Sequence, residues 1–143
     1  MLKFLVTGAA GQLGKDVVRE LENRGYEVTG SGSKKRKTAG RYVKMDITDR
    51  NEVEAVMKKL RPDIVIHCAA WTAVDLAEDP EKAEKVRAIN VGGTQNMADT
   101  CKKLGCKMTY ISTDYVFDGQ GTEPWQPDCR DYRPLNVYGQ TKL

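Results

Sequence analysis

The sequence has little histidine and few aromatic residues. It contains one histidine and four cysteines, and no two cysteines form a C-x-x-C pair. A zinc site or a redox motif is therefore disfavoured, and we expect no metal. We expect reduced thiols, as in a cytoplasmic protein. No apolar stretch approaches the length of a membrane-spanning helix, and the first predicted strand leaves no room for a signal peptide, so we expect no membrane partner.

Positive charge is concentrated in one short stretch. The 143 residues carry a formal net charge of +3, and four of the cations stand together at 34–37. Without these four the net charge is −1. A general nucleic-acid-binding surface is therefore not expected. Length and composition fit a single globular domain.

Three glycines follow the first apolar strand, which spans 2–6. Gly8 permits a tight turn, Gly11 lets the backbone approach a pyrophosphate, and Gly14 lets a helix pack close to the strand. In such a strand–turn–helix unit, the N–H groups of the first helical turn face the phosphates. The spacing G-x-x-G-x-x-G differs from the G-x-G-x-x-G form. Taken alone, the turn is also compatible with a simple tight connection.

Strand and helix patterns then alternate along the chain. Further strands are predicted at 26–29, 41–44, 63–67 and 107–112. This order predicts an α/β fold, a Rossmann-like doubly wound parallel sheet with strand order 3-2-1-4-5. Ligands of such folds bind at the carboxyl ends of strands 1 and 4. The glycine turn and the loop at 69–79 both fall at this edge.

Helix boundaries are marked by capping residues. Asp49 with Glu52 forms a capping box before a helix that Pro62 ends. Pro80 follows the candidate cap Asp79 and predicts the start of a long helix that reaches about Leu104. The segment 113–136 reads as a loop, and 137–143 resembles the start of a helix.

Tyr138 and Lys142 lie four residues apart and share one face of this last helix. A lysine so placed stabilises the phenolate and lowers the tyrosine pKa toward neutrality, which makes the tyrosine a proton donor to a carbonyl. Thr113 follows the fifth strand beside the same crevice. Together with the nucleotide loop, these residues indicate hydride transfer to a carbonyl. The Tyr-x-x-x-Lys pair alone is equally an exposed helical pair.

These motifs resemble the extended short-chain dehydrogenases/reductases, and within them the dTDP-4-dehydrorhamnose reductase family. The resemblance rests on the stretches 68–78, 89–91, 112–119 and 134–143. It implies NAD(P)H-dependent reduction of the C4 ketone of dTDP-4-dehydro-L-rhamnose to dTDP-L-rhamnose, with a dTDP-sugar as the substrate. Two alternatives stay open: a nucleotide-sugar epimerase or dehydratase of the same superfamily, and a non-catalytic NADP-binding regulatory subunit.

The resemblance also implies residue roles. Thr113, Tyr138 and Lys142 are the expected catalytic residues, and Asp114 and Tyr115 are the expected sugar contacts. The cofactor-binding residues that it implies are Gly8, Gly11, Gln12, Leu13, Gly14, Asp46, Ile47, Ala69, Ala70, Thr72, Tyr138 and Lys142. Asn90 either supports a proton relay or is a polar residue in helix packing. His67 is expected to pack or to contact backbone.

The end of the second strand lacks an acidic residue. An NAD-selective site usually has Asp or Glu there to bind the ribose diol. Positions 30–36 instead carry hydroxyls and cations, including Ser31 and Lys34, which suit a 2′-phosphate. We expect both residues to bind cofactor and NADPH to be preferred, with NADH as the alternative. The competing interpretation is a solvated basic loop.

Members of the family that the chain resembles are longer and build a smaller C-terminal substrate domain. We therefore expect 1–143 to be an NAD(P)-binding Rossmann domain, an N-terminal fragment whose substrate domain is absent. Such a fragment should bind nucleotide weakly and turn over little substrate. Two helical turns are too short to be stable without packing, so the last helix is expected either to fray or to be held by a neighbouring molecule. The fifth strand becomes an exposed edge, so a homodimer is a candidate assembly.

Overall fold

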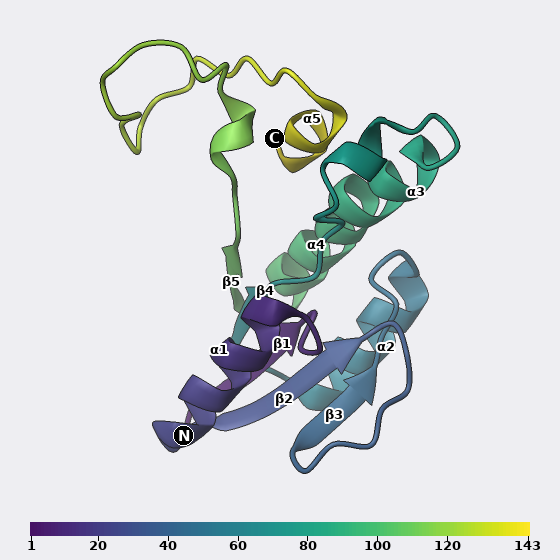
Figure 1. The fold of residues 1–143 in the computed structure, drawn as a ribbon. Coiled ribbons are helices and arrows are strands. Elements are labelled where there is room, and N and C mark those ends of the chain that lie inside the picture. The colour runs from purple at the N-terminus through teal and green to yellow at the C-terminus, as the bar shows by residue number, and fades with distance from the viewer.

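The computed structural model describes all 143 residues and shows a parallel five-stranded sheet with helices on both faces (Figure 1). The strand order is β3-β2-β1-β4-β5, and every neighbouring pair runs parallel. The expected doubly wound topology is therefore confirmed. The strands are β1 (Lys3–Thr7), β2 (Glu27–Gly32), β3 (Arg41–Lys44), β4 (Ile64–His67) and β5 (Lys107–Tyr110).

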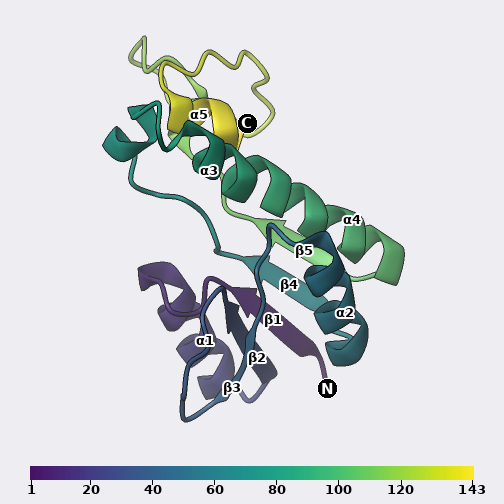
Figure 2. The ribbon, with the colours of Figure 1, turned by 90° about the vertical axis from the view of Figure 1, so that its right-hand side faces the viewer.

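The helices form one layer on each side of the sheet (Figure 2). Helix α1 (Gln12–Asn23) covers one face, and α2 (Arg50–Leu60) and α4 (Thr94–Leu104) cover the other. The main core lies between the sheet and α2 and α4. Its fully buried members include Leu5, Val65, Val53, Met57 and Met97. Burying each such side chain contributes about 1.5–3 kcal/mol. This core holds the carboxyl ends of β1 and β4 side by side.

Only the Asp49 half of the predicted capping box is present, because the Glu52 carboxylate accepts from Lys44 Nζ at 3.1 Å and the Asp49 N–H donates to the Asp46 carbonyl at 3.1 Å. The predicted long helix is divided. The Asp49 carboxylate accepts the Glu52 backbone N–H at 3.1 Å, as expected. The helix predicted from Pro80 to Leu104 instead begins as α3 (Ala83–Arg87), passes through a π-helical turn, η2 (Ala88–Gly93), and continues as α4. The Asp79 carboxylate accepts the N–H of Glu81 in a turn before α3, so Pro80 does not open the helix.

Two strands differ in length from the prediction. Strand β2 extends to Gly32, beyond the predicted 26–29, and β5 ends at Tyr110, before the predicted end at 112. The extension of β2 has low intrinsic strand propensity, but it pairs with β1 on one side and β3 on the other. Short 3₁₀ turns, η1 (Asp75–Glu78) and η3 (Asp114–Val116), lie in the two long loops.

The last helix, α5 (Val137–Lys142), is capped and packed by residues of this chain, so the expectation that it frays or is held by a neighbouring molecule is wrong. The Asn136 side chain accepts the Gly139 N–H at 2.7 Å. The Glu78 carboxylate, from η1, accepts the Val137 N–H at 2.6 Å. A Cβ at Gly139 would lie 2.2 Å from the Tyr115 carbonyl oxygen, so the glycine lets α5 approach η3 closely. These contacts hold the Tyr-x-x-x-Lys pair in place.

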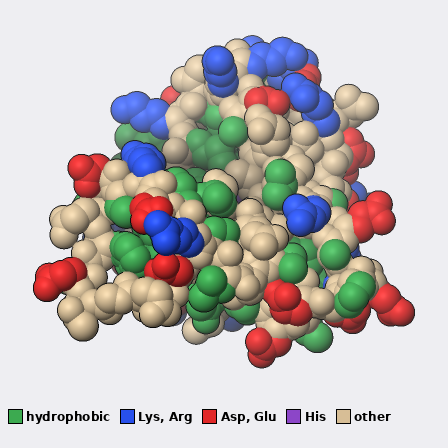
Figure 3. Space-filling model, turned by 90° about the horizontal axis from the view of Figure 1, so that it is seen from above, with side chains coloured by type: hydrophobic (Ala, Val, Ile, Leu, Met, Phe, Trp, Pro, Cys, Tyr) green, Lys and Arg blue, Asp and Glu red, His purple; other side chains and the backbone are tan.

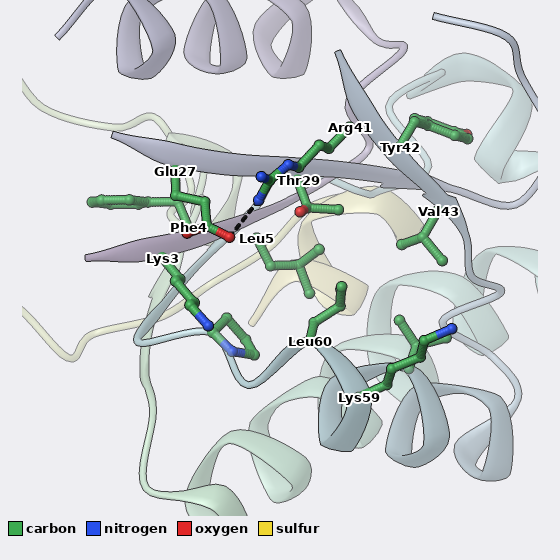
Figure 4. A pocket seen from close by; sticks show the side chains of 12 residues that line it. Lys3, Phe4, Leu5, Glu27, Thr29, Arg41, Tyr42, Val43, Lys59 and Leu60 are labelled. Carbon is green, nitrogen blue, oxygen red and sulfur yellow. Dashed lines mark hydrogen bonds and ion pairs between the residues drawn. The ribbon is translucent and has the colours of Figure 1, made fainter. Parts of the chain in front are cut away.

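A cavity of about 410 Å³ lies between α2 and the amino-terminal half of the sheet (Figure 4). Leu5, Val43 and Leu60 line it, and Glu27 and Arg41 form an ion pair at its edge. None of the expected cofactor-binding residues lines this cavity. The structure contains no helix long and apolar enough to cross a membrane. Strand β5 forms one edge of the sheet, and pairing of that edge with another copy stays a prediction.

Candidate cofactor and catalytic site

The glycine turn has the geometry that its residues predict. Gly8 has a φ of +64°, and a Cβ there would lie 2.7 Å from the Ala69 backbone nitrogen. A Cβ at Gly14 would lie 2.0 Å from the Gly8 carbonyl oxygen, so α1 packs directly onto the turn. Gly11 is the N-cap of α1 and offers no side-chain cap. The N–H groups of the first helical turn are therefore free for an anion, at the positive end of the helix dipole.

A buried polar chain joins the glycine turn to the loop after β4. The Ala69 N–H donates to Thr7 Oγ1 at 3.1 Å, and Thr7 Oγ1 lies 2.8 Å from His67 Nδ1. His67 Nε2 lies 3.3 Å from Thr94 Oγ1. Thr7 Oγ1 accepts from Ala69 and keeps both its proton and a second lone pair for Nδ1, so these contacts fit either tautomer of the neutral ring. Burial, with a smaller effect of Lys142, lowers the pKa of His67 to about 4, so the ring is neutral.

These hydrogen bonds confirm the packing role expected of His67. Its polar contacts are to threonine side chains and not to backbone, and its ring stacks on Tyr110 with the centroids 6.4 Å apart. Sequence reasoning missed Thr7 and Thr94. A threonine that directly precedes the glycine turn is the one signal that could have marked Thr7.

Asn90 ties the loop after β4 to α5. It is 2% exposed and lies in the π-helical turn. Its Oδ1 accepts the Trp71 N–H at 2.8 Å, and its Nδ2 donates to the Trp71 carbonyl at 3.2 Å and to Thr141 Oγ1 at 3.0 Å. All three contacts are structural. Of the two roles left open for Asn90, the structure supports packing.

Helix α5 and η3 bring the expected catalytic and sugar-contact residues together. The rings of Tyr138 and Tyr115 meet edge to face, with centroids 5.9 Å apart. Thr113 caps η3, and its Oγ1 accepts the Tyr115 N–H at 3.2 Å. Burial raises the pKa of Tyr138, and the nearby Thr113 side chain opposes that rise. Asp114 is exposed beside them. Thr113 therefore lies near Tyr138, and the catalytic role of the two residues stays a prediction.

Lys142 is the buried cation of the site, with 5% of its surface exposed. Its Nζ lies 4.4 Å from the ring centroid of Tyr110, and Tyr110 Oη donates to the Lys142 carbonyl at 3.1 Å. Burial lowers the pKa of Lys142. The pKa of Tyr138 is raised, mainly by burial, and Lys142 is not among the groups that shift it. The expected lowering of the Tyr138 pKa by Lys142 is thus not seen in this structure.

Asp46 and Ile47, two of the expected cofactor-binding residues, differ in which of their atoms remain free to contact a cofactor. One carboxylate oxygen of Asp46, Oδ1, accepts from Thr48 N–H at 2.9 Å and Thr48 Oγ1 at 2.7 Å. Its other oxygen makes no hydrogen bond. The side chain of Ile47 is in the main core, and its carbonyl accepts from Asn96 Nδ2 at 2.9 Å. Any cofactor contact of Ile47 is therefore made by other backbone atoms.

The remaining expected residues lie in the segments that follow β1, β2 and β4. Figure 3 shows the molecule from above, with hydrophobic side chains near the middle of the view and charged side chains around them. Gln12 and Leu13 are exposed at the start of α1, and Ala70 and Thr72 follow β4. Lys34 is exposed beyond the end of β2. Ser31 differs from these exposed residues, because only 1% of its surface is exposed and its Oγ has no hydrogen-bond partner.

These residues fit a dinucleotide. The glycine cradle leaves no room for a Cβ at Gly8 or Gly14, and free N–H groups open α1. No carboxylate stands at 30–37, whereas four cations do. The fold and the glycine turn define a Rossmann-type protein with a doubly wound parallel sheet. The chain belongs to the family described as the RmlD substrate binding domain, whose model matches residues 2–143.

Named relatives extend this result. Over 141 residues the chain is 40% identical to a dTDP-4-dehydrorhamnose reductase of Streptomyces griseus, covering 98% of this chain and 42% of that protein. It is 34% identical to methionine adenosyltransferase 2 subunit beta of Xenopus laevis, and the match covers 99% of this chain and 40% of that protein. A crystal structure of dTDP-4-dehydrorhamnose reductase from Bacillus anthracis in complex with NADP is 37% identical in sequence and superposes with a TM-score of 0.86. The match covers 99% of this chain and 47% of that chain. The chain spans less than half of each.

Proposed function

We propose that this chain is the cofactor-binding half of an NADPH-dependent dTDP-4-dehydrorhamnose reductase, which reduces the C4 ketone of dTDP-4-dehydro-L-rhamnose. One observation carries the proposal: beyond the carboxyl end of β5, the ring of Tyr138 on α5 packs against Tyr115, whose N–H donates to Thr113 Oγ1. The similarity to the Streptomyces and Bacillus reductases supports the substrate class, and the NADP in the Bacillus complex supports the cofactor.

We further propose that 1–143 is the NAD(P)-binding domain and that a separate substrate domain completes the site. The support is that the chain spans only 42% and 47% of these two relatives. Groups that recognise the dTDP part of the substrate then lie outside this chain. Asp114 and Tyr115 are the residues of this chain that face the sugar.

The residues have distinct tasks in this proposal. The N–H groups of Gln12, Leu13 and Gly14 bind the pyrophosphate, and the basic loop binds the 2′-phosphate. NADPH, when bound, supplies the hydride. Thr113 Oγ1 holds the ketone oxygen, and Tyr138 Oη donates a proton to it. Tyr138 is protonated at neutral pH, and burial, which raises its pKa, makes it a weaker acid in this chain than the lowered pKa expected from the sequence would. Lys142 supplies a cation on the same helix face as the phenolate that remains.

Nucleotide binding and turnover test separate parts of the proposal. The 143-residue chain should quench or shift NADPH fluorescence and show little oxidation of NADPH with dTDP-4-dehydro-L-rhamnose. Protein that also contains the substrate half should turn the sugar over, and Tyr138→Phe should lower kcat by about 10²–10⁴-fold while NADPH binding is kept. A chain that does not bind NADPH, or a Tyr138→Phe enzyme with unchanged kcat, overturns the proposal.

A non-catalytic NADP-binding subunit is the second candidate. It is favoured by the 34% identity to methionine adenosyltransferase 2 subunit beta and by the engagement of Lys142 with Tyr110. Such a subunit would bind NADPH and show no turnover even with the substrate half present. A nucleotide-sugar epimerase would instead purify with tightly held NAD and absorb at the nicotinamide band.

A further inference from the structure

Tyr42 lies on β3 in register with Gly30 of β2. A Cβ at Gly30 would lie 3.6 Å from Tyr42 Cδ2, and a Cβ at Gly32 would lie 2.5 Å from Tyr42 Oη. The ring therefore runs along β2 over two positions that have no side chain. Any residue larger than glycine at 32 would push the hydroxyl away. The two glycines of β2 thus set where the Tyr42 hydroxyl lies.

The Tyr42 hydroxyl holds the start of the basic loop. It donates to the Lys34 carbonyl oxygen at 2.8 Å. No other side-chain hydrogen bond reaches any of the residues 34–37. The loop has one further side-chain hydrogen bond, from Thr38 Oγ1 to the Gly40 carbonyl at 2.9 Å, at its far end. The four cations of the loop are exposed.

The same stretch of β2 also contacts the glycine turn. The Ala9 N–H donates to the Ser31 carbonyl at 3.0 Å, and a Cβ at Gly30 would lie 2.7 Å from Ala9 Cβ. The pyrophosphate-binding turn and Tyr42 are therefore both positioned against β2. Through Tyr42, the first cation of the loop has a defined place relative to the turn.

We propose that Tyr42 is a positioning residue for cofactor selectivity, which holds the basic loop where it meets the 2′-phosphate of NADPH. This inference rests on the proposed binding of NADPH. A loop that is ordered before binding loses less conformational entropy when the phosphate arrives. Tyr42 touches the loop backbone and not a charge, so it should affect only ligands that carry the 2′-phosphate.

The test measures dissociation constants of the 143-residue chain without any turnover. NADPH and NADH are followed by nicotinamide fluorescence, and 2′,5′-ADP and 5′-ADP by calorimetry. Loss of one neutral hydrogen bond predicts that Tyr42→Phe weakens NADPH and 2′,5′-ADP about fivefold. NADH and 5′-ADP should bind as they do to the unaltered chain. Equal weakening of all four ligands, or no weakening, overturns the inference.

Two control variants separate this role from general loosening of the loop. Thr38→Ala removes the other side-chain hydrogen bond of the loop and should leave the NADPH to NADH ratio unchanged. Replacing all four cations at 34–37 by glutamine should abolish the preference, and adding Tyr42→Phe to that variant should change nothing further. A further loss in the glutamine background would show that Tyr42 acts independently of the loop charges.

Folding and the cofactor assignment are checked separately. Circular dichroism establishes that Tyr42→Phe is folded. If it is not, Gly32→Ala provides the second variant, because its Cβ displaces the Tyr42 hydroxyl, and the same loss confined to phosphorylated ligands is expected. Unaltered protein that binds NADH as tightly as NADPH contradicts the proposed cofactor. A preference for NADPH that is unchanged in both variants contradicts only the role of Tyr42.

Discussion

The Lys142 ammonium lies over the ring of Tyr110, with Nζ 4.4 Å from the centroid. The hydroxyl of the same tyrosine donates to the Lys142 carbonyl, so Tyr110 holds both ends of this residue. Lys142 forms no salt bridge, although only 5% of it is exposed. The aromatic face is therefore the contact within this chain that stabilises the Lys142 ammonium.

Two substitutions at Tyr110 separate its two contacts with Lys142. Tyr110→Phe keeps the ring and removes one hydrogen bond, so the free energy of unfolding should fall by about 0.5–1.5 kcal/mol. Tyr110→Leu also removes the aromatic face and should cost about 1–2 kcal/mol more. Urea unfolding measures both values. Tyr132→Phe, at an exposed tyrosine, is the control and should change little. Equal costs for the two Tyr110 variants would show that the ring does not stabilise the cation.

The buried imidazole of His67 should make stability depend on pH. Its pKa is lowered from 6.5 to about 4, mainly by burial, so the unfolded chain binds a proton that the folded chain rejects. Stability therefore rises with pH between about 4 and 6.5, by about 3 kcal/mol over the whole window. His67→Gln should remove this part of the slope. Urea unfolding from pH 4 to 7 checks it, and parallel curves for the two proteins would contradict the assignment.

The sequence predicted those features of the fold that depend on residues close together along the chain. The Asp49 N-cap and the glycine turn appear as expected, because each depends on residues a few positions apart. The π-helical turn was not predicted, since one extra residue in a turn leaves no mark in an apolar pattern. The packing of α5 was also missed, because the carboxylate that caps Val137 comes from Glu78, 59 residues earlier.

Part of the candidate site was likewise predictable from the sequence and part was not. Topology predicted that Thr113 and Tyr138 lie near each other, because both come after strands that end at the carboxyl edge of the sheet. The contact of Lys142 with Tyr110 did not, since helical spacing pairs Lys142 with Tyr138 and says nothing about the strand beneath. The role of Tyr42 was equally hidden, because its hydroxyl reaches a backbone carbonyl that no side-chain pattern marks.

Asn90 should hold the loop after β4 and α5 together as one unit. Asn90→Ala removes three hydrogen bonds and leaves the Trp71 amide and the Thr141 hydroxyl without this partner. We expect the free energy of unfolding to fall by about 2–4 kcal/mol. Hydrogen exchange should quicken at Trp71 and along α5 before it quickens in β1. Asn96→Ala, which removes one bond from α4 to Ile47, is the control and should leave α5 protected.

The contact between Gly14 and the Gly8 carbonyl should make position 14 intolerant of any side chain. A Cβ there would lie 2.0 Å from the Gly8 carbonyl oxygen, and relief requires α1 to move away from the turn. Gly14→Ala should therefore lower the free energy of unfolding by about 1–3 kcal/mol. It should also abolish detectable binding of NADPH, because the N–H groups of α1 would no longer point at the pyrophosphate.

Gly92→Ala is the matched control, since no atom lies within 4 Å of its added Cβ. It should be neutral or stabilising by about 0.4–1 kcal/mol. Thermal unfolding and NADPH fluorescence measure the two effects, and Gly14→Ala protein that binds NADPH normally would show that the glycine turn is not the phosphate site.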